Sequence, residues 1–196
     1  GPGRYRMGVP VLSLGYACLA GMQVRNTAQV YMQELADKAG DGVLVALGGR
    51  DDMAMTYIAA ARSQGVISLQ LSVGSRISLA RSAIGQAYIA GTTESERADI
   101  IDRIQMRYEP DRVSEIMDKL DAAREQVAAR GFYCMIGDWQ RDVNAVAVPY
   151  RSQQPDTPML AFNLGGYSFA LPKERLEDDL GPRPVELVNM GNRVGY

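Results

Sequence analysis

The sequence contains no histidine, and this absence removes most of the common catalytic and zinc-binding arrangements. Ser-His-Asp and Cys-His catalysis both need an imidazole as the base. Two cysteines, Cys18 and Cys134, are too few for a tetrathiolate zinc site or a disulfide framework. We therefore expect a protein with no metal site, no cofactor and no enzymatic activity of the familiar kinds, made in a reducing cytoplasm.

Long apolar runs and an excess of positive charge are also missing. No apolar stretch approaches the roughly 18 residues that span a bilayer, and the N-terminus lacks the pattern of a signal peptide. The net charge is −2, from 21 Lys and Arg against 23 Asp and Glu. Proteins that grip a phosphate backbone concentrate positive charge instead. We expect this chain to contact no membrane and to bind no nucleic acid by itself.

Hydrophobic periodicity divides the 196 residues into alternating groups of helices and strands. It predicts helices over residues 11–20, 24–39, 82–91, 93–106 and 110–130, and a last helix from Lys173 that is interrupted near Gly181-Pro182. It predicts strands over residues 43–47, 53–60, 66–73, 132–136, 143–149 and 159–165. Because neither half alternates strand and helix, we predict an α+β fold with a mostly antiparallel six-stranded sheet, helices packed on it, and a sensor-like layout.

Several local signals fix the ends of these elements. Thr93 and Glu96 have the spacing of a capping box, in which each side chain satisfies a backbone amide at the start of a helix. Gly131 follows the last apolar position of the helix over 110–130 and predicts its end. The glycine-rich segment 48–52 predicts the turn of a hairpin between the first two strands.

Six short segments occur in an order and spacing typical of one protein family. They are residues 4–8 (RYRMG), 11–15 (VLSLG), 73–76 (VGSR), 82–87 (SAIGQA), 130–132 (RGF) and 144–149 (NAVAVP). In this order they resemble the linker and the effector-binding domain of the IclR family of bacterial transcription regulators. The chain departs from the family pattern at Leu79-Ala80-Arg81, where a histidine often precedes the turn, and at Gln86, where Lys or Arg often follows the turn glycine.

The resemblance implies a GAF-like sensor domain over residues 9–196 that binds a small organic acid or an aromatic acid. Residues 1–8 are then the remnant of the wing and linker of a winged helix-turn-helix domain that this sequence does not contain. The resemblance also implies a homodimer or homotetramer that contacts DNA only through that other domain. Effector binding would favour one arrangement of the assembly and so change how the DNA-binding domains are presented.

The turn Arg81-Ser82-Ala83-Ile84-Gly85 is one candidate wall of an effector site. The first N–H groups of the helix that follows lack partners within the helix and favour an anion. By resemblance, we expect the backbone of Ala83 and Ile84 to contact an effector carboxylate. Alternatively, Ser82 only caps the helix and the small residues serve packing. Arg81 either pairs with the effector or points into solvent.

The last two strands supply a second candidate wall. A symmetric hairpin around the loop 150–158 places Asn144 nearly opposite Asn163. Alternation then places Val146 with Asn144, and Gly165 with Asn163. Two amides facing one pocket can orient a carboxylate, a hydroxyl or a carbonyl. The alternatives are that they bond each other or the backbone, or that this face is solvated.

The remaining candidates form the rim and the apolar lining. Asp138 and Trp139 lie in a loop between strands, and we expect Asp138 to bond an effector hydroxyl and Trp139 to cover the mouth, unless both are surface residues. Leu69, Ile77 and Met55 are candidate apolar lining, with plain core positions as the alternative.

Two other functions stay open at this point. The chain could be a dimerisation module that binds no ligand. It could also be a small enzyme in which Asp138 acts with Lys173 or Glu174, although nothing in the sequence brings these residues together. A cavity between the turn at Ser82 and the strand that carries Asn163 would favour the sensor.

Overall fold

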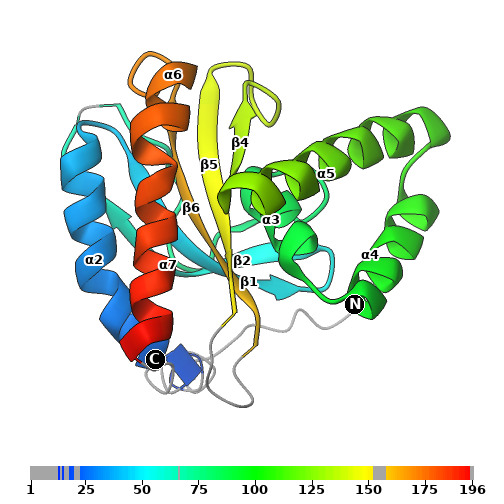
Figure 1. Ribbon diagram of the computed structural model, residues 1–196, viewed down its shortest axis with the longest axis horizontal. Helices are drawn as coiled ribbons and strands as arrows, with labels where there is room; N and C mark the ends of the chain where they lie inside the picture. The colour runs from blue at the N-terminus through cyan, green and yellow to red at the C-terminus, as the bar shows by residue number, and fades with distance from the viewer. Residues whose placement is uncertain are drawn as a thin grey trace, which may run out of the picture.

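A six-stranded antiparallel sheet forms the centre of the protein (Figure 1). The computed structural model describes residues 13, 15, 18–19, 23–65, 67–151 and 158–194. The strands run in the order β3-β2-β1-β6-β5-β4, and all five pairings are antiparallel. Their bounds are β1 (Leu44–Asp51), β2 (Ala54–Arg62), β3 (Arg76–Ser78), β4 (Tyr133–Ile136), β5 (Val143–Tyr150) and β6 (Leu160–Tyr167). The predicted fold class is confirmed.

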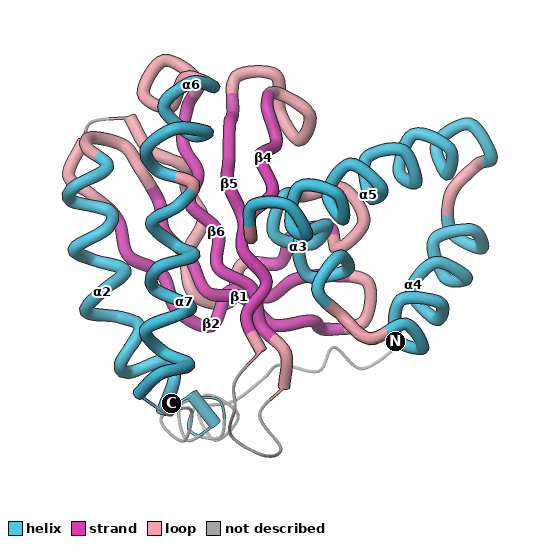
Figure 2. The backbone as a smooth tube through the Cα atoms, in the orientation of Figure 1, coloured by secondary structure: helices cyan, strands magenta, loops and turns pink. Residues whose placement is uncertain are grey.

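Helices cover both faces of the sheet (Figure 2). They are α2 (Gln23–Ala39), α3 (Ala83–Gly91), α4 (Glu94–Arg107), α5 (Pro110–Arg130), α6 (Lys173–Arg175), the π-helical turn η1 (Leu176–Leu180) and α7 (Pro182–Val194). On one face α2 packs against β1 and β2, and α7 packs against β5 and β6. On the other face α3 lies on β5 and β6, α5 packs against α3, and α4 contacts α3 and α5.

The sheet separates two hydrophobic cores, and some positions of its central strands present side chains of different size to each. In β5, Ala145 and Ala147 face α3, whereas Val146 and Val148 face α2 and α7. The same contrast holds in β1, where Ala46 faces α3 between two larger residues that face α2. At these positions, alternation along the strand places small residues on the α3 side and bulkier ones on the other.

A β-bulge reverses the faces of β2 partway along the strand. Leu47 pairs with Ala59, but the next residue, Gly48, pairs with Tyr57, so Ile58 is the extra residue. As a result Tyr57 points toward α3 while Ala59, two residues later, points toward α2. Bulges re-aim side chains in this way.

The predicted hairpin between the first two strands is confirmed, but its turn is not at residues 48–52. Gly48 and Gly49 lie within β1, and the chain turns at Asp52, which has φ 56°. A Cβ on Gly48 would lie 2.9 Å from Cδ1 of Ile84. Glycine therefore serves the close approach of α3 to the strand here, and not a turn.

The predicted strand over residues 66–73 is wrong. Residue 66 lies outside the described residues, residues 67–75 form no strand, and the third strand is the short β3. Of the predicted apolar face, Leu69 is buried, but Ile67 and Val73 are 57% and 42% exposed. The segment forms only isolated backbone hydrogen bonds with β2, for example from Gly74 N to Tyr57 O (2.8 Å). It therefore does not pair with β2 as a continuous strand, although its sequence alternates.

The predicted caps of the central helices are present. Ser82 Oγ accepts from Gly85 N at 3.2 Å and begins α3, and Thr93 Oγ1 accepts from Glu96 N at 3.3 Å and begins α4. Gly131, with φ 82°, ends α5. The reciprocal half of the capping box is absent, because the Glu96 carboxylate is held by other donors.

The C-terminal helical segment continues past the predicted break as α6, the π-helical turn η1 and α7. Gly181 N donates to Leu176 O at 2.8 Å, five residues back, which is the hydrogen bond of a π turn. Pro182 then begins α7 at a first helical position, where its missing N–H is tolerated. Of the helix predicted over 11–20, only residues 13, 15, 18 and 19 are described, and they are helical; residues 1–8 lie outside the described residues.

A partly buried carboxylate joins α4 to the sheet and to α3. Glu96 accepts from Arg50 of β1 (3.0 Å), from the Tyr88 hydroxyl of α3 (2.8 Å) and from Thr92. Burial raises the pKa of Glu96, but the hydrogen bonds from Thr92, Tyr88 and Arg50 outweigh it and leave the pKa below its usual range. Arg50 also bonds Asp99 at 3.1 Å, so a single guanidinium ties two turns of α4 to β1.

Gly85 packs so closely on the turn before α3 that a methyl group should not fit. A Cβ there would lie 2.0 Å from Leu79 O. We expect Gly85→Ala to lower the free energy of unfolding by at least about 2 kcal/mol, as measured by urea denaturation. Gly15→Ala is the matched control, because a Cβ at this exposed helical position meets nothing within 4 Å. Equal stability of the two variants would contradict the close packing.

Glu96 should also give the protein a specific sensitivity to acid. A folded-state pKa below the unfolded value means that Glu96 stabilises the fold above about pH 4.3 and loses this effect as the pH falls through the lower folded pKa. Glu96→Gln should therefore be less stable than the wild type at pH 7, with the difference shrinking below pH 4. The measurement is urea unfolding across pH, with Glu125→Gln, at an exposed position of α5, as the control. A difference that did not change with pH would refute the role of the carboxylate.

Candidate functional site

A small cavity, open in part to solvent, lies between the sheet and the start of α3. Half of the predicted site residues line it: Leu69, Ile77, Ser82, Ala83, Asn163 and Gly165. Trp139, the expected cover of the mouth, lines it too. The turn before α3 and the strand that carries Asn163 thus meet at one cavity, as the sensor hypothesis requires.

Five lining residues were not among the predicted site residues: Tyr57, Leu71, Met135, Val143 and Ala145. The alternation of β5 could have indicated Val143 and Ala145, had the register of the last hairpin been known. Leu71 follows Leu69 at a period of two, which the sequence shows. Nothing in the sequence indicated Tyr57, because its orientation depends on the bulge at Ile58.

Small side chains form the floor of the cavity. Ala145 of β5 pairs directly with Gly165 of β6, and both face α3. A Cβ added to Gly165 would meet Asn163 Nδ2 at 3.4 Å and the Ala145 Cβ at 3.5 Å. The space above these residues therefore exists because neither strand supplies a side chain long enough to fill it.

The start of α3 forms a polar wall. Ser82 and Ala83 line the cavity, and the Ser82 hydroxyl is occupied in capping the amide of Gly85. Among the described residues, the amide of Ala83 meets no acceptor. A free N–H group at the positive end of a helix dipole favours a carboxylate at this wall.

Tyr57 and Asn163 form a second polar feature. The Asn163 amide donates to the Tyr57 hydroxyl at 3.4 Å. The two residues are only 1% and 7% exposed. Burial raises the pKa of Tyr57 far above its usual range, more than the bond from Asn163 lowers it, so the hydroxyl keeps its proton at physiological pH.

The predicted pairing of Asn144 with Asn163 is wrong. Asn163 lies opposite Ala147, and Asn144 lies opposite Gly166. The observed register differs from the symmetric one by three residues, and an odd shift moves a side chain to the other face of a sheet. Asn144 and Val146 consequently lie on the face covered by α2 and α7, outside the cavity.

Asn144 bonds the backbone instead of facing a ligand site. Its Oδ1 accepts from Gly137 N at 3.0 Å, and its Nδ2 donates to Leu171 O at 2.8 Å. The side chain holds the loop after β4 and the segment after β6 against the sheet. This is the backbone-bonding alternative considered for the two asparagines.

The other predicted residues do not line the cavity. Arg81 is exposed to solvent, and Ile84 is buried in the core beside Gly48. Gly85 packs on Leu79 O, and Met55 is fully buried in the core. Asp138 is exposed and forms an ion pair with Lys119 at 2.8 Å.

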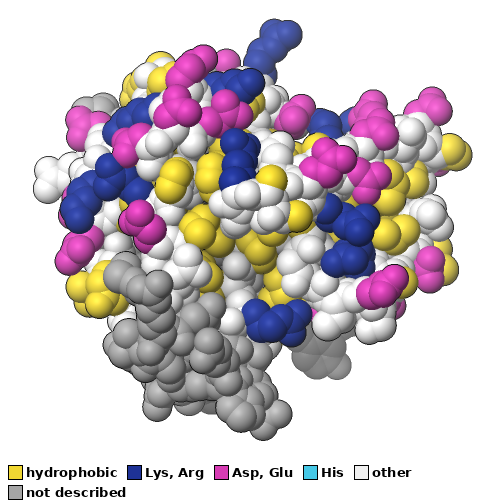
Figure 3. Space-filling view, in the orientation of Figure 1, with side chains coloured by type: hydrophobic (Ala, Val, Ile, Leu, Met, Phe, Trp, Pro, Cys, Tyr) yellow, Lys and Arg dark blue, Asp and Glu magenta, His cyan; other side chains and the backbone are white. Residues whose placement is uncertain are grey.

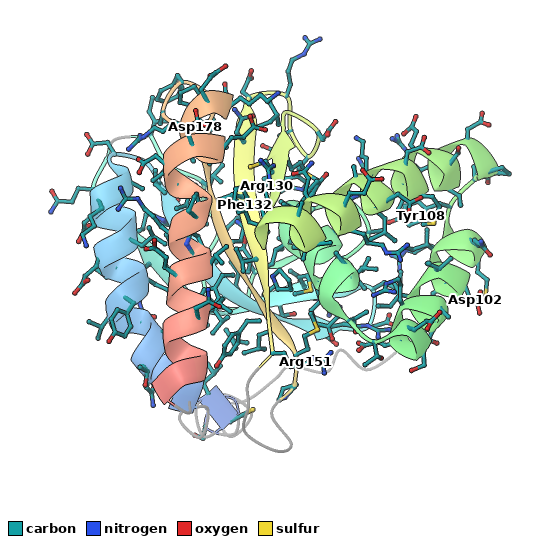
Figure 4. The ribbon with its side chains drawn as sticks, viewed as in Figure 1. Asp102, Tyr108, Arg130, Phe132, Arg151 and Asp178 are labelled. Atoms are coloured by element: carbon teal, nitrogen blue, oxygen red, sulfur yellow. The ribbon has the colours of Figure 1, made fainter. Side chains whose placement is uncertain are left out.

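A separate polar cluster lies where α5 ends and β4 begins. Arg130 stacks over the ring of Phe132, 4.3 Å from its centroid (Figure 4), and bonds Gln126. Burial raises the pKa of the nearby Cys134 to about 11, which makes this thiol a poor nucleophile. The cluster is therefore packing around the buried end of β4.

Charges and ligating groups are spread over the surface. In the part of the chain that the structure describes, no three His, Cys, Asp or Glu side chains come together as metal ligands. Figure 3 shows Lys and Arg interspersed with Asp and Glu on the face in view. None of the described helices combines the length and apolar character needed to cross a membrane.

Comparisons with known proteins agree on one family. Residues 16–180 match the family described as bacterial transcriptional regulator IclR C-terminal. The structure is similar to an IclR family transcriptional regulator from Brucella abortus, with a TM-score of 0.87 and 38% sequence identity over 98% of this chain and 71% of that one. It also resembles the IclR of Thermotoga maritima, with a TM-score of 0.76 and 19% identity over 98% of this chain and 77% of that one, which supports the fold alone.

A characterised relative is more distant in sequence. The chain is 26% identical over 140 residues to the Pca regulon regulatory protein of Pseudomonas putida. The match covers 71% of this chain but only 47% of that protein. This chain therefore corresponds to about half the length of that relative.

The two asparagines should respond differently to replacement by leucine. Asn144→Leu leaves Gly137 N and Leu171 O without their buried partner, and we expect a loss of about 2–4 kcal/mol in unfolding free energy. Asn163→Leu removes one long bond inside the cavity, and we expect a change within about 1 kcal/mol. Urea denaturation of both variants checks this. A larger loss for Asn163→Leu would show that Asn163 is structural.

Proposed function

The chain belongs to the IclR family of bacterial transcriptional regulators, of which it is the C-terminal effector-binding domain, and we propose that its effector is a small organic or aromatic acid bound in the cavity between α3 and the sheet. The observation that carries this proposal is the convergence of Ser82, Ala83 and Asn163 on one cavity. A dimerisation module without a ligand would have no need to keep this space unfilled, because cavities lower stability.

The chemistry of the walls supports an acid of low charge. The amide of Ala83 at the start of α3 offers an anion a hydrogen bond, and most of the other wall is apolar. No Lys or Arg is among the described residues that line the cavity. One carboxylate fits the helix start, whereas a second one would have no cation to balance it and would pay for its desolvation.

Effector binding would act by shifting a population of conformations. An effector stabilises whichever arrangement binds it more tightly, by no more than the difference in its two affinities. We propose that this domain assembles into a homodimer or homotetramer in the bacterial cytoplasm. The DNA contact would belong to a winged helix-turn-helix domain, and the effector-binding domain would set how a pair of these domains is presented. The domain itself would catalyse no reaction.

A panel of small acids tests the proposal. We expect at least one monocarboxylate among benzoate, its ring-substituted derivatives and aliphatic acids of four to six carbons to raise the melting temperature of the wild type and to bind in calorimetry. Asn163→Leu should weaken that binding about tenfold while the fold survives, because an apolar side chain replaces the amide in the cavity. Turnover of any panel member would favour an enzyme.

Arg81→Ala separates two ways of holding the anion. Arg81 is exposed and lies outside the cavity. If the backbone amide at the start of α3 holds the carboxylate, Arg81→Ala should leave the affinity for the same acid unchanged. A loss of affinity on Arg81→Ala would show that the guanidinium holds the carboxylate. Failure of every acid to bind the wild type would refute the acid effector.

A further inference from the structure

The Tyr57 hydroxyl has a proton to donate, and no group in the described part of the chain receives it. It accepts from the Asn163 amide at 3.4 Å, and both residues line the cavity. Among the described residues, no acceptor lies within hydrogen-bond distance of this hydroxyl as a donor. Buried polar groups normally find partners, so a donor that is almost fully buried beside an empty space points to a ligand or water acceptor.

The backbone is arranged to bring this hydroxyl to the cavity. Without the extra residue Ile58, Tyr57 and Ala59 would share a face of β2; the bulge sends only Tyr57 toward α3. Gly48, directly opposite Tyr57, supplies no side chain, and a Cβ there would lie 3.5 Å from Tyr57 Cδ1. A phenylalanine would fill the same volume without the cost of a buried hydroxyl.

The proton of Tyr57 defines what the ligand must offer. The hydroxyl oxygen already receives the bond from Asn163, so its free capacity is to donate. Because it stays protonated at physiological pH, it is a neutral donor and suits a neutral acceptor oxygen. The start of α3 already provides for the carboxylate, so this second oxygen belongs to another part of the ligand.

We propose that Tyr57 is a specificity-determining residue that donates a hydrogen bond to a second oxygen of the effector, a carbonyl or an equivalent acceptor, separate from the carboxylate. The effector is then an oxygen-bearing acid and not a plain hydrocarbon acid. This inference rests on the proposed function, since it assumes that the cavity binds an acid. It adds the second functional group and the residue that recognises it.

Matched pairs of acids test the inference. The probes are 4-formylbenzoate against 4-methylbenzoate, and levulinate against valerate, so that each pair differs at the acceptor oxygen and the two pairs differ in length. Calorimetric titration of the wild type should show about tenfold tighter binding of the oxygen-bearing member in at least one pair, as expected where a site is built to hydrogen-bond a ligand group. Tyr57→Phe should remove that preference and leave the affinity for the hydrocarbon member within about twofold.

Tyr133→Phe is the matched control. Tyr133 is also a buried tyrosine on the α3 side of the sheet, but it does not line the cavity. Removing its hydroxyl should leave the preference intact, and melting temperatures without ligand show whether either variant perturbs the fold. If Tyr57→Phe is destabilised, the ratio of affinities within each pair still reports the preference, because both members bind the same folded variant.

The outcomes separate the two hypotheses. Equal binding of both members of each pair by the wild type would overturn the role of Tyr57 and leave the acid-binding cavity standing. A preference that persists in Tyr57→Phe would also overturn it, and would assign the recognition to another donor. Absence of binding by all four acids would overturn the proposed function and this inference with it.

Discussion

Small side chains on one face of the central strands are the constraint on which the site depends. Ala145 and Gly165 pair across β5 and β6 and leave the space above them unfilled, while Val146 and Val148 of β5 fill the core on the opposite face. An unfilled space beside apolar walls costs stability, because the surrounding atoms lose contacts. A ligand that fills it restores those contacts and stabilises the state that binds it. The cavity therefore makes the fold responsive to a small molecule.

Local chemistry made much of this fold predictable from the sequence. Ser82, Thr93 and Gly131 mark helix ends through bonds between near neighbours in the chain, and the structure has all three. The class of the sheet followed from the order of the elements. The turn before α3 was identifiable as a site wall for the same reason, since the amides at a helix start are a local property.

Pairing between distant segments was not predictable, and the errors in the site come from it. The register of β5 on β6 decides whether Asn144 faces α3 together with Asn163, and an error of three residues wrongly added Asn144 to the predicted site. The bulge at Ile58 decides where Tyr57 points, and no residue type in β2 predicts a bulge at that position. The segment after β2 resembled a strand because its apolar and polar residues alternate, but alternation does not show whether a partner strand is present.

Helix α3 connects the cavity to the polar network that holds α4. Its first turn contributes Ser82 and Ala83 to the cavity, and Tyr88, farther along the same helix, donates to Glu96. Glu96 in turn receives Arg50 from β1. Helix α3 is nine residues long, so the cavity wall and the Tyr88 hydroxyl lie on one short, continuous element. The close contact of Gly85 with Leu79 O packs the start of this helix against the turn before it. The turn and the helix are therefore packed as one unit, and this packing fixes the position of Ser82 and Ala83 at the cavity.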